Sequence, residues 1–439
     1  MRKITALRFT LLGLLLFVAL APAEQRELII LHTNDLHARF LPGVKKRGGF
    51  AQLAAVIRHE RDGCRSCILL NAGDLTQGTP VSTLFHGVPV YEVANLLGFD
   101  VSTLGNHEFD YGWQKVLQFL QVARFPTVSA NVVDAQDRLL TPHAYLIRSV
   151  NGVRVAILGV MTGDLATLST PDLLGPWHAA PVIETVRRYA AELRNKSDLI
   201  VVLGHITGQE EDALLREVPD VPVIVSGHLH TGLQEPKIFD GRLDVRVAGY
   251  GEELGRLELL VDVPRKSVAR WTWKRLPVDA STIPPAADVA KVVAGWEAKV
   301  SKIVDVPIGE SKREFSVAEV KTLIEKAMCE EMHADFAFMN KGGVRDFLPQ
   351  GTILARHVWN IMPFDNRVVT GRFQGSQLPP AVTKGRSIDP NREYTLAISD
   401  FIAANQKTEL GASGLVFPVK GPLQRDLIID WVKKQKVLQ

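Results

Sequence analysis

The chain has 439 residues, of which 46% are hydrophobic and 23% are charged, a composition that is ordinary for a globular protein and argues against a disordered one. Its length exceeds what one hydrophobic core usually supports, so we expect two domains. The formal net charge is +3, but residues 1–23 hold three of the 51 basic residues and none of the 48 acidic ones. The remainder is therefore formally neutral, which argues against a nucleic-acid polymer or an anionic membrane as partner and favours small molecules.

Residues 1–23 are predicted to be a secretory signal peptide. A basic start precedes an apolar stretch from Leu11 to Leu20, and the small residues Ala21 to Ala23 provide a cleavage site. An uncleaved membrane anchor is the alternative, but the apolar stretch is shorter than the roughly 20 residues that a spanning helix needs. We therefore expect an exported protein, periplasmic or secreted, without stable membrane insertion after cleavage.

Five short aliphatic runs each end in residues that can bind metals. Gly, Asn or Asp bounds each run, which is typical of buried strands. With the residues that follow them, they read LIILHTNDLH (28–37), CILLNAGD (67–74), VSTLGNHEFD (101–110), LIVVLGHI (199–206) and VIVSGHLH (223–230). Side chains just past the carboxyl ends of parallel strands meet at one edge of a sheet. If the five strands share one sheet, that edge gathers Asp35, His37, Asp74, Asn106, His107, His205, His228 and His230.

Helical patterns alternate with these runs, and this alternation predicts an α/β layered domain. The expected helical segments are 50–61, 81–99 and 183–198. Strands without charged ligands at their ends are expected within 126–133 and 153–161. The segment 243–263 alternates polar and apolar residues, and we expect it to close the domain as antiparallel strands with Gly249 and Gly251 at the bend.

Cys64 and Cys67 form a C-x-x-C pair before the second run, and Cys329 is alone. In an exported protein a disulfide is favoured over a zinc knuckle, and a redox centre is a third reading that the spacing permits. Because the pair precedes its strand, it should lie at the end of the sheet opposite the ligands. We therefore expect a structural role.

A turn-rich stretch at 277–285, followed by a predicted helix over 289–304, indicates a connection between domains. From about Pro307 the chain forms a smaller α/β unit that ends in a predicted helix over 423–435. The predicted division is a signal peptide at 1–23, a first domain at 24–277, a linker with a connecting helix at 278–305, and a second domain at 306–439.

Each ligand motif is weak alone, because a lone D-x-H is usually a helix cap beside a surface histidine. Gly105 is expected to let the backbone turn sharply, so that Asn106 and His107 face the same place. His228 and His230 are two residues apart, so in an extended segment both would project to one side. Five such motifs in one domain favour a metal site, and carboxylate and imidazole ligands without thiolate suit Zn²⁺, Mn²⁺, Fe or Co²⁺.

Two metal ions close together need a bridging group, for which Asp74 is the natural candidate. Such a pair polarises a phosphoryl oxygen, lowers the pKa of a bound water, and supports an in-line displacement. His107 is then available as a proton donor to a phosphoryl oxygen or to the leaving group, with Asp110 fixing its tautomer. The pattern predicts hydrolysis of a phosphate ester.

The motif order DLH, GD, GNHEFD, GH and GHxH resembles the calcineurin-like metallophosphoesterases. Over nearly the whole mature chain, longer stretches are similar to the secreted 5′-nucleotidase/UDP-sugar hydrolase family. These are HTNDLHARF, NAGDLTQGTP, TLGNHEFDYG, FPTVSAN and AGYGEELGRLEL in the first domain, and NKGGVRDFLPQGTI, MPFDNRVV and AISDFIA in the second. The resemblance implies an α/β fold, with a two-sheet αββα sandwich followed by a smaller α/β substrate-binding domain.

The resemblance also implies two divalent metal ions and a residue set for each. The first would bind to Asp35, His37, Asp74 and His230, and the second to Asp74, Asn106, His205 and His228. Many family members have Gln or Asn in place of His230, so metal preference could differ. The catalytic dyad falls on His107 and Asp110, and the substrate contacts fall on Asn340, Arg345, Phe364, Phe401 and, more loosely, Arg313.

Physical chemistry agrees with the substrate contacts, since arginine offers a planar fork to phosphate and aromatic faces stack on any base. Core packing is the alternative for Phe364 and Phe401. The family usually has a Gly-Gly-Asp-Gly-like loop after the second stacking aromatic, whose Asp holds the ribose hydroxyls. This chain has FIAANQKTELGASGL at 401–415 instead, and residues 309–328 replace a Gly-Asn-Leu-rich helix start.

We therefore expect an exported phosphohydrolase with two divalent metals that acts on nucleotides or similar phosphate esters. The alternative enzyme reading keeps the metal chemistry and changes the substrate to a 2′,3′-cyclic nucleotide, a UDP-sugar or a thiosulfohydrolase-type substrate. A third reading is a nucleotide-binding protein without turnover.

Overall fold

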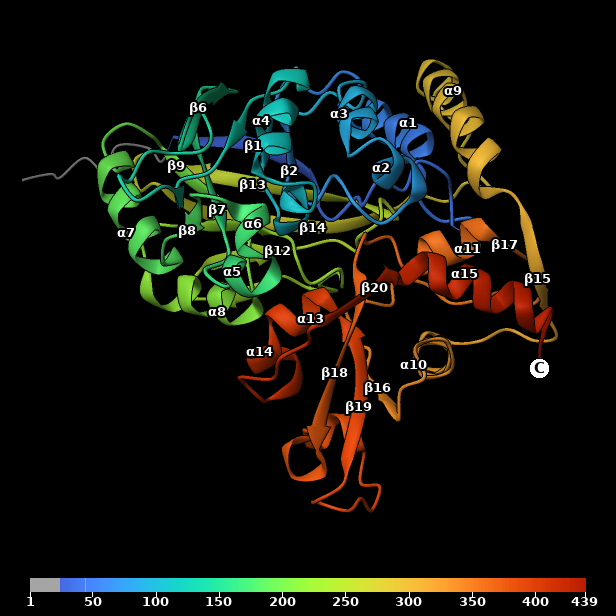
Figure 1. The fold of residues 1–439 in the computed structure, drawn as a ribbon. Helices are drawn as coiled ribbons and strands as arrows, with labels where there is room; N and C mark the ends of the chain where they lie inside the picture. The colour runs from blue at the N-terminus through green and yellow to red at the C-terminus, as the bar shows by residue number, and fades with distance from the viewer. Residues whose placement is uncertain (1–23, 44) are drawn as a thin grey trace, which may run out of the picture.

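The computed structural model describes residues 24–43 and 45–439, so the predicted signal peptide lies outside the described residues. Figure 1 shows a larger first domain and a smaller second domain, drawn in orange and red, that lies against one side of it. Among the described residues, no helix combines the length and the hydrophobicity that a membrane crossing requires.

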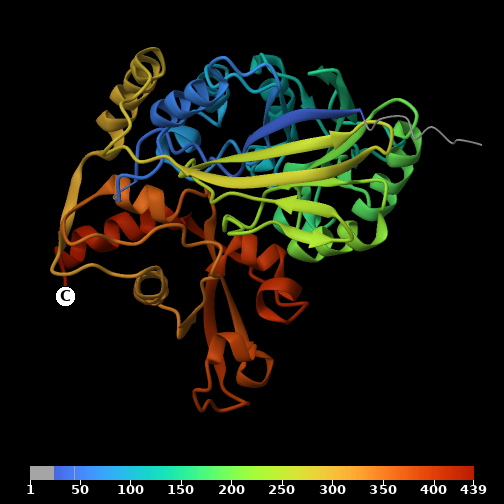
Figure 2. The ribbon, with the colours of Figure 1, turned by 180° about the vertical axis from the view of Figure 1, so that it is seen from behind.

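Two six-stranded sheets form the centre of the first domain. The first sheet has the order β14 (Ser267–Pro277), β13 (Glu253–Asp262), β1 (Gln25–Thr33), β2 (Cys67–Asn71), β3 (Val101–Thr103) and β4 (Thr127–Val128). The second has the order β11 (Lys237–Phe239), β12 (Arg242–Val245), β10 (Val223–Ser226), β9 (Leu199–His205), β7 (Val153–Met161) and β6 (Tyr145–Val150). A separate pair is β5 (Val132–Val133) with β8 (His178–Ala179). Figure 2 shows the long strand β13 and its neighbour at the sheet edge, β14, in yellow.

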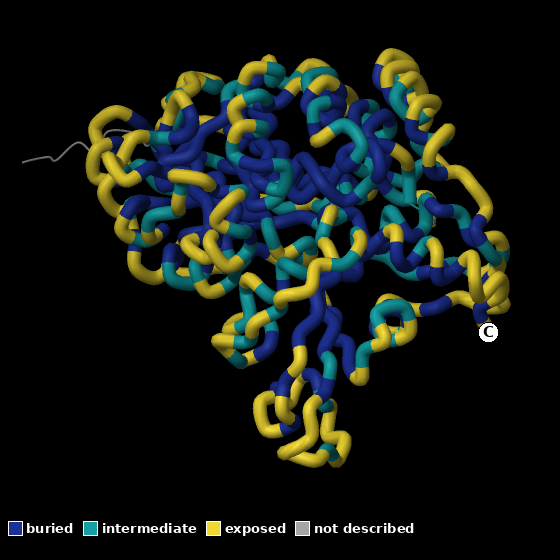
Figure 3. The backbone as a smooth tube through the Cα atoms, in the orientation of Figure 1, coloured by how far each residue is buried: buried dark blue, intermediate teal, exposed yellow. Residues whose placement is uncertain are grey.

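The aliphatic runs become strands because both of their faces are covered. Side chains of both sheets, such as Ile30, Leu70, Val155 and Val201, share one fully buried apolar cluster between them. Helices cover the outer faces and pack two further clusters against the sheets. The fold is the expected αββα sandwich, and Figure 3 shows the buried backbone concentrated in the sheets.

The helices of the first domain and linker include the predicted ones. They are α1 (Phe50–Arg61), α2 (Pro80–Leu84), α3 (Val88–Ala94), the 3-10 helix η1 (Asn106–Phe109), α4 (Trp113–Val122), α5 (Leu165–Leu168), α6 (Pro171–Leu174), α7 (Val182–Leu193), α8 (Gly208–Glu217) and α9 (Ala287–Val304). The helix over 50–61 is confirmed as α1, and the expected crossover over 81–99 is two short helices rather than one.

The premise that the five ligand-bearing strands share one sheet is wrong. β1, β2 and β3 lie in parallel in the first sheet, whereas β9 and β10 lie in parallel in the second. The segment 243–263 is also divided: β12 pairs in parallel with β10, and β13 pairs antiparallel with β1 and β14. Gly251, with φ +67°, lies between these two strands. The chain therefore crosses between the sheets at the bend that we placed within one sheet.

The second domain has two small sheets and its own apolar cores. Its strands are β17 (Gly351–Leu354), β15 (Pro307–Ser311) and β21 (Val437–Leu438) in one sheet, and β16 (Phe336–Ala337), β19 (Glu393–Ser399), β18 (Arg367–Gln374) and β20 (Val419–Leu423) in the other. Its helices are α10 (Val317–Met332), α11 (Ala355–Ile361), the 3-10 helix η2 (Gly375–Gln377), α12 (Pro380–Thr383), α13 (Asp400–Ala404), α14 (Gln406–Leu410) and α15 (Gln424–Gln435).

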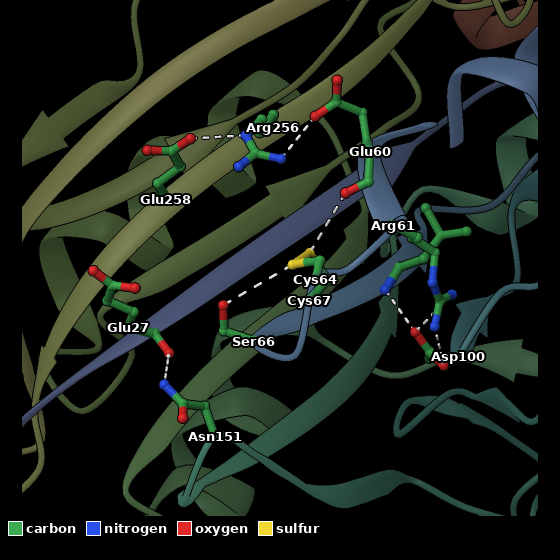
Figure 4. The surroundings of a disulfide bond; sticks show 11 residues. Glu27, Glu60, Arg61, Cys64, Ser66, Cys67, Asp100, Asn151, Arg256 and Glu258 are labelled. Carbon is green, nitrogen blue, oxygen red and sulfur yellow. Dashed lines mark hydrogen bonds and ion pairs between the residues drawn. A yellow bond between two sulfur atoms is a disulfide. The ribbon is translucent and has the colours of Figure 1, made fainter. Parts of the chain in front are cut away.

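The Cys64–Cys67 pair is a disulfide, with its Cα atoms 5.7 Å apart. Cys67 is the first residue of β2, so the bond lies at the opposite end of that strand from Asp74. Figure 4 shows it beside Glu60 and Arg61 at the end of α1, with no predicted site residue among those labelled. This placement agrees with a structural role.

Candidate metal centre

The ligand residues converge although their strands belong to different sheets. Asp35, Asp74 and Asn106 follow β1, β2 and β3, whereas His205 is the last residue of β9 and His228 follows β10. The carboxyl ends of the two parallel sets open toward the same place, because Nε2 of His205 is 3.1 Å from both Asn106 Oδ1 and Asp74 Oδ2. The sandwich thus brings together the carboxyl ends of strands from two sheets, whereas we expected these ends to belong to a single sheet.

The first group of ligands consists of Asp35, His37, Asp74 and His230, whose ligand atoms all lie within 4.8 Å of one another. Nε2 of His37 is 2.9 Å from Nε2 of His230 and 3.7 Å from Oδ2 of Asp74. Nε2 of His230 is also 3.5 Å from Oδ1 of Asp35. Asp35, His37 and Asp74 are fully buried.

The second group consists of Asn106, His205 and His228. Oδ1 of Asn106 is 3.1 Å from both Nε2 of His205 and Nδ1 of His228. Those two ring nitrogens are 3.3 Å apart. Oδ2 of Asp74 is close to His205 in this group and to His37 in the first. Asp74 is therefore the carboxylate that borders both groups, as a bridging ligand must.

The charge states of these residues suit divalent cations. Burial lowers the pKa of His228 and of His230 to about 3, so both imidazoles keep a free lone pair at neutral pH. Burial also raises the pKa of Asp35 to about 6, because its carboxylate is fully desolvated and faces Asp74. Oxygen and imidazole donors without thiolate match Zn²⁺, Mn²⁺, Fe²⁺ and similar ions. The donor set fits a divalent ion of this kind.

Several ligands have a backbone conformation that is rare for residues with a side chain. The φ angles are 52° at Asp35, 47° at His37, 54° at Asp74, 80° at His228 and 58° at His230. The assumption that His228 and His230 lie in an extended segment is therefore wrong, and their side chains reach the site through left-handed turns. Such conformations cost about 1–3 kcal/mol each and persist where the surrounding contacts fix them, often at functional sites.

The predicted reason for Gly105 is also wrong. Its backbone is extended, with φ −109° and ψ 177°, and does not turn sharply. Glycine is required because a Cβ at this position would overlap the carboxylate of Asp74. This close approach lets the His107 amide donate to Asp74 Oδ1 over 2.9 Å. The hydrogen bond joins the loop after β2 to the loop after β3.

Glu108 was missed by the sequence reasoning, although it organises both of these loops. Its carboxylate is fully buried and accepts hydrogen bonds from the backbone amides of Gly105 (2.6 Å), Asp74 (3.1 Å), Leu75 (2.9 Å) and Thr76 (3.2 Å). The sequence signal for this role was the position of Glu108, an acidic residue between the predicted catalytic His107 and Phe109. The structure makes Glu108 the link that fixes Asp74 relative to Asn106.

His107 and Asp110 form the pair that was expected. Nδ1 of His107 is 2.8 Å from Oδ2 of Asp110, and both side chains are mostly buried. Burial disfavours the imidazolium, but the nearby carboxylates of Asp110 and Asp74 outweigh it, so the pKa of His107 is raised. With Nδ1 engaged, Nε2 is the ring atom available for proton transfer.

Two predicted substrate residues of the second domain reach the metal centre. Nη2 of Arg345 is 3.4 Å from Nε2 of His37, and the Phe364 ring stacks on the His107 ring with centroids 5.9 Å apart. Thr83 supports this approach by donating to the carbonyl of Pro363 over 2.8 Å. Residues of the second domain therefore lie directly beside the candidate metal centre.

The remaining three predicted substrate residues have other contacts. Asn340 is 9% exposed, and its side chain lies near that of Glu409 from α14, within the segment that departs from the family. Phe401 is the second residue of α13 and packs, partly buried, against the apolar cluster of β18 and β19. Arg313 pairs with Glu319 at 2.8 Å and covers the Phe315 ring, so its charge is already engaged.

Tyr250 is a second residue that the sequence reasoning did not assign. Its hydroxyl is 3.1 Å from Nδ1 of His230, which directs Nε2 of that ring toward the metal centre. The Arg39 guanidinium lies 5.0 Å from the centroid of the Tyr250 ring. The AGYG motif contained this residue, but only the fold shows that it contacts a ligand.

A buried ionic network supports the loop that carries His228 and His230. Arg246 donates through Nε to the carbonyl of Thr231 over 2.8 Å and pairs with Glu211. Asp244, fully buried beside Glu211, has a pKa raised to about 8, first by burial and then by the charge of Glu211. This network anchors the end of the loop beneath the site.

Comparison with protein families agrees with this geometry. Residues 28–232 match the calcineurin-like phosphoesterase model, and residues 299–384 match the model of the 5′-nucleotidase C-terminal domain. The chain belongs to the calcineurin-like phosphoesterases with a 5′-nucleotidase C-terminal domain. It is thus a metal-dependent phosphoesterase by family, and the resemblance seen in the sequence is confirmed.

Named relatives cover much of the chain. The endonuclease YhcR of Bacillus subtilis is 27% identical over 94% of this chain, which spans only 40% of that protein. The 5′-nucleotidase of Vibrio cholerae is 27% identical over 82% of this chain and 77% of its own length. The crystal structure of the 5′-nucleotidase precursor from Thermus thermophilus has a TM-score of 0.85 at 24% identity, covering 94% of this chain and 97% of that one, so the fold is shared.

Proposed function

We propose that this phosphoesterase is an exported enzyme that uses two divalent metal ions to release phosphate from nucleotides, as a 5′-nucleotidase does. The observation that carries the proposal is the contact of Arg345 and Phe364, from the second domain, with His37 and His107 at the metal centre. A cation and an aromatic face beside metal ligands suit a phosphate joined to a base. Export rests on the sequence of residues 1–23, and the relatives named 5′-nucleotidase support the substrate class.

In this proposal Asp35, His37, Asp74 and His230 hold one ion, and Asp74, Asn106, His205 and His228 hold the other. Bound there, the ions supply Lewis acidity for the phosphoryl group and activate the attacking water. The protein itself excludes bulk solvent, since Asp35, His37, Asp74 and His205 are fully buried.

His107 is the proposed general acid, and Asp110 holds it. Because Nδ1 is fixed by Asp110 at 2.8 Å, Nε2 delivers the proton to the leaving nucleoside oxygen. Arg345 offers its guanidinium to the phosphate, and Phe364 offers its ring to the base. Roles for Asn340, Phe401 and Arg313 stay predictions, and the engagement of Arg313 with Glu319 makes it the weakest of the three.

The test is a hydrolysis panel with purified protein and added Mn²⁺ or Zn²⁺, in which chromatography of the products detects each cleavage, whether or not it releases inorganic phosphate. The substrates are AMP, UDP-glucose, 2′,3′-cyclic AMP, a thiosulfohydrolase-type substrate and an aryl phosphate. We expect AMP to have the highest kcat/KM. Phe364→Ala should lower kcat/KM for AMP about tenfold or more, the scale of one base stack, and should affect the aryl phosphate much less.

Phe239→Ala is the matched control, because Phe239 is an exposed phenylalanine on β11. Cleavage of the aryl phosphate alone would contradict the nucleotide assignment. Binding of AMP without release of phosphate at any metal concentration would favour a binding protein instead.

A further inference from the structure

Arg39 joins the two domains beside the metal centre. It lies after β1, and its Nη1 is 3.1 Å from Oδ2 of Asp346 in the second domain. The two side chains are only 17% and 23% exposed, so solvent screens this pair less than an ordinary surface pair. Within residues 24–43 and 45–439, it is the one ion pair that connects the first domain with residues 306–439.

Asp346 directly follows Arg345, the residue that reaches the metal centre. Oδ2 of Asp346 faces Arg39, and Oδ1 accepts from the backbone amide of Phe347 over 3.0 Å. Both carboxylate oxygens are therefore engaged, and the backbone next to Arg345 has little freedom. The Arg345 amide is itself bonded to the carbonyl of Ile361 over 2.9 Å.

The charge of Arg345 has a different environment. No carboxylate in the described part of the chain lies within ion-pair distance of its guanidinium, whose nearest recorded polar contact is Nε2 of His37 at 3.4 Å. A guanidinium without a counter-ion beside buried imidazoles stays there only if other contacts hold it, and it is then free to bind an anion. The Arg39–Asp346 ion pair, at the adjacent residue, is such a contact.

Arg39 is also fixed from the first domain. Its guanidinium covers the ring of Tyr250 at 5.0 Å, and Tyr250 contacts the metal-site residue His230. A continuous series of contacts thus runs from Asp346 through Arg39 and Tyr250 to His230. The second domain is therefore positioned against the same side of the centre from which Arg345 approaches.

We propose that Asp346 and Arg39 are positioning residues: their ion pair across the domain boundary holds Arg345 where the phosphate of the substrate binds. The inference rests on the proposed function for its substrate class. It goes beyond that function by assigning the residues that make the phosphate site depend on the contact between the domains. The pair acts through Arg345 and does not itself touch the substrate.

The test uses Asp346→Asn, an isosteric change, together with Arg39→Gln and the charge swap Arg39→Asp/Asp346→Arg. Each single variant should lower kcat/KM for AMP about tenfold, mainly by raising KM, the scale of one partly shielded charge pair. The charge swap should recover part of that loss. Glu393→Gln, which removes the Arg372–Glu393 pair at 3.6 Å within the second domain, is the control and should behave as wild type.

A double-mutant cycle separates positioning from general destabilisation. If Asp346 acts through Arg345, Asp346→Asn should cause no more than a twofold further loss in an Arg345→Ala background. Full additivity of the two changes, or single variants within twofold of wild type, would overturn the proposal.

A binding measurement keeps the proposal independent of turnover. In calorimetry with inorganic phosphate on metal-loaded protein, Asp346→Asn should weaken the affinity about tenfold, while Glu393→Gln leaves it unchanged. If wild type does not hydrolyse AMP, the proposed function fails and this titration still decides the role of Asp346. Unchanged phosphate affinity in a folded Asp346→Asn protein would reject it.

Discussion

Nε2 of His37 and Nε2 of His230 face each other at 2.9 Å although the residues are 193 positions apart in the chain. Burial lowers the pKa of both rings, so both are neutral at neutral pH, and in the appropriate tautomer Nε2 of one ring donates to Nε2 of the other. In the proposed centre, a cation bound by both nitrogens and the nearby carboxylates would replace this hydrogen bond.

Removal of metal should therefore destabilise the protein. We expect a chelator to lower the Tm and added Mn²⁺ or Zn²⁺ to restore it, because an ion that binds only the folded state adds about 2.7 kcal/mol at a hundred times its Kd. Calorimetry with and without metal measures this. His230→Ala should reduce the metal-dependent gain, whereas His178→Ala, at an exposed histidine on β8, should keep all of it. A Tm independent of metal would contradict the expectation.

His107→Ala should lower turnover of AMP by about 10²-fold or more, the contribution of a general acid. Metal content should not change, because His107 belongs to neither ligand group. The loss should be smaller for an aryl phosphate whose leaving group needs no proton. Turnover of AMP near the wild-type rate in His107→Ala would remove the residue from the mechanism.

Glu108→Gln should weaken metal binding. The glutamine side chain offers one acceptor and one donor where the carboxylate accepts four backbone amides, so some of those amides lose their partner at about 1–3 kcal/mol each. We expect the metal concentration for half-maximal activity to rise at least tenfold. Glu92→Gln, at an exposed glutamate on α3, is the control. Unchanged metal affinity in Glu108→Gln would show that the loops hold their shape without this carboxylate.

Asp244→Asn should change how stability depends on pH. The folded state raises the pKa of Asp244 from 3.8 to about 8, so between these values the folded protein keeps a proton that the unfolded chain releases. This group therefore lowers the free energy of unfolding as pH rises through that range. Urea unfolding should show Asp244→Asn gaining stability over wild type from pH 5 to pH 8, by on the order of 1–3 kcal/mol. Parallel pH profiles would contradict this, and Asp240→Asn, at an exposed aspartate, should give them.

The sequence allowed the convergence of these side chains to be predicted because each one follows a short aliphatic run. That local pattern is the same whether a strand lies in the first or the second sheet, so it could not reveal that β9 and β10 pair apart from β1. Sheet membership depends on which faces pack together over long sequence distances. The convergence of His205 with Asp74 was predicted correctly from a premise about the sheet that was wrong.

The residues that were missed act through long-range or backbone contacts. Glu108 accepts from amides of another loop, and no side-chain pattern reports backbone donors. Arg39 becomes relevant only when the second domain brings Asp346 against it, and Tyr250 only when the fold brings its hydroxyl to His230. The turns at Asp35 and His228 have positive φ at residues that are not glycine, which composition does not indicate.

Elemental analysis of the purified, active protein tests the two-metal centre most directly. Wild type should hold two transition-metal ions per chain, His228→Ala should lose one, and Asp74→Ala should lose both because its carboxylate borders both groups. An active wild-type protein without stoichiometric metal, or an Asp74→Ala protein that retains two ions, would contradict it.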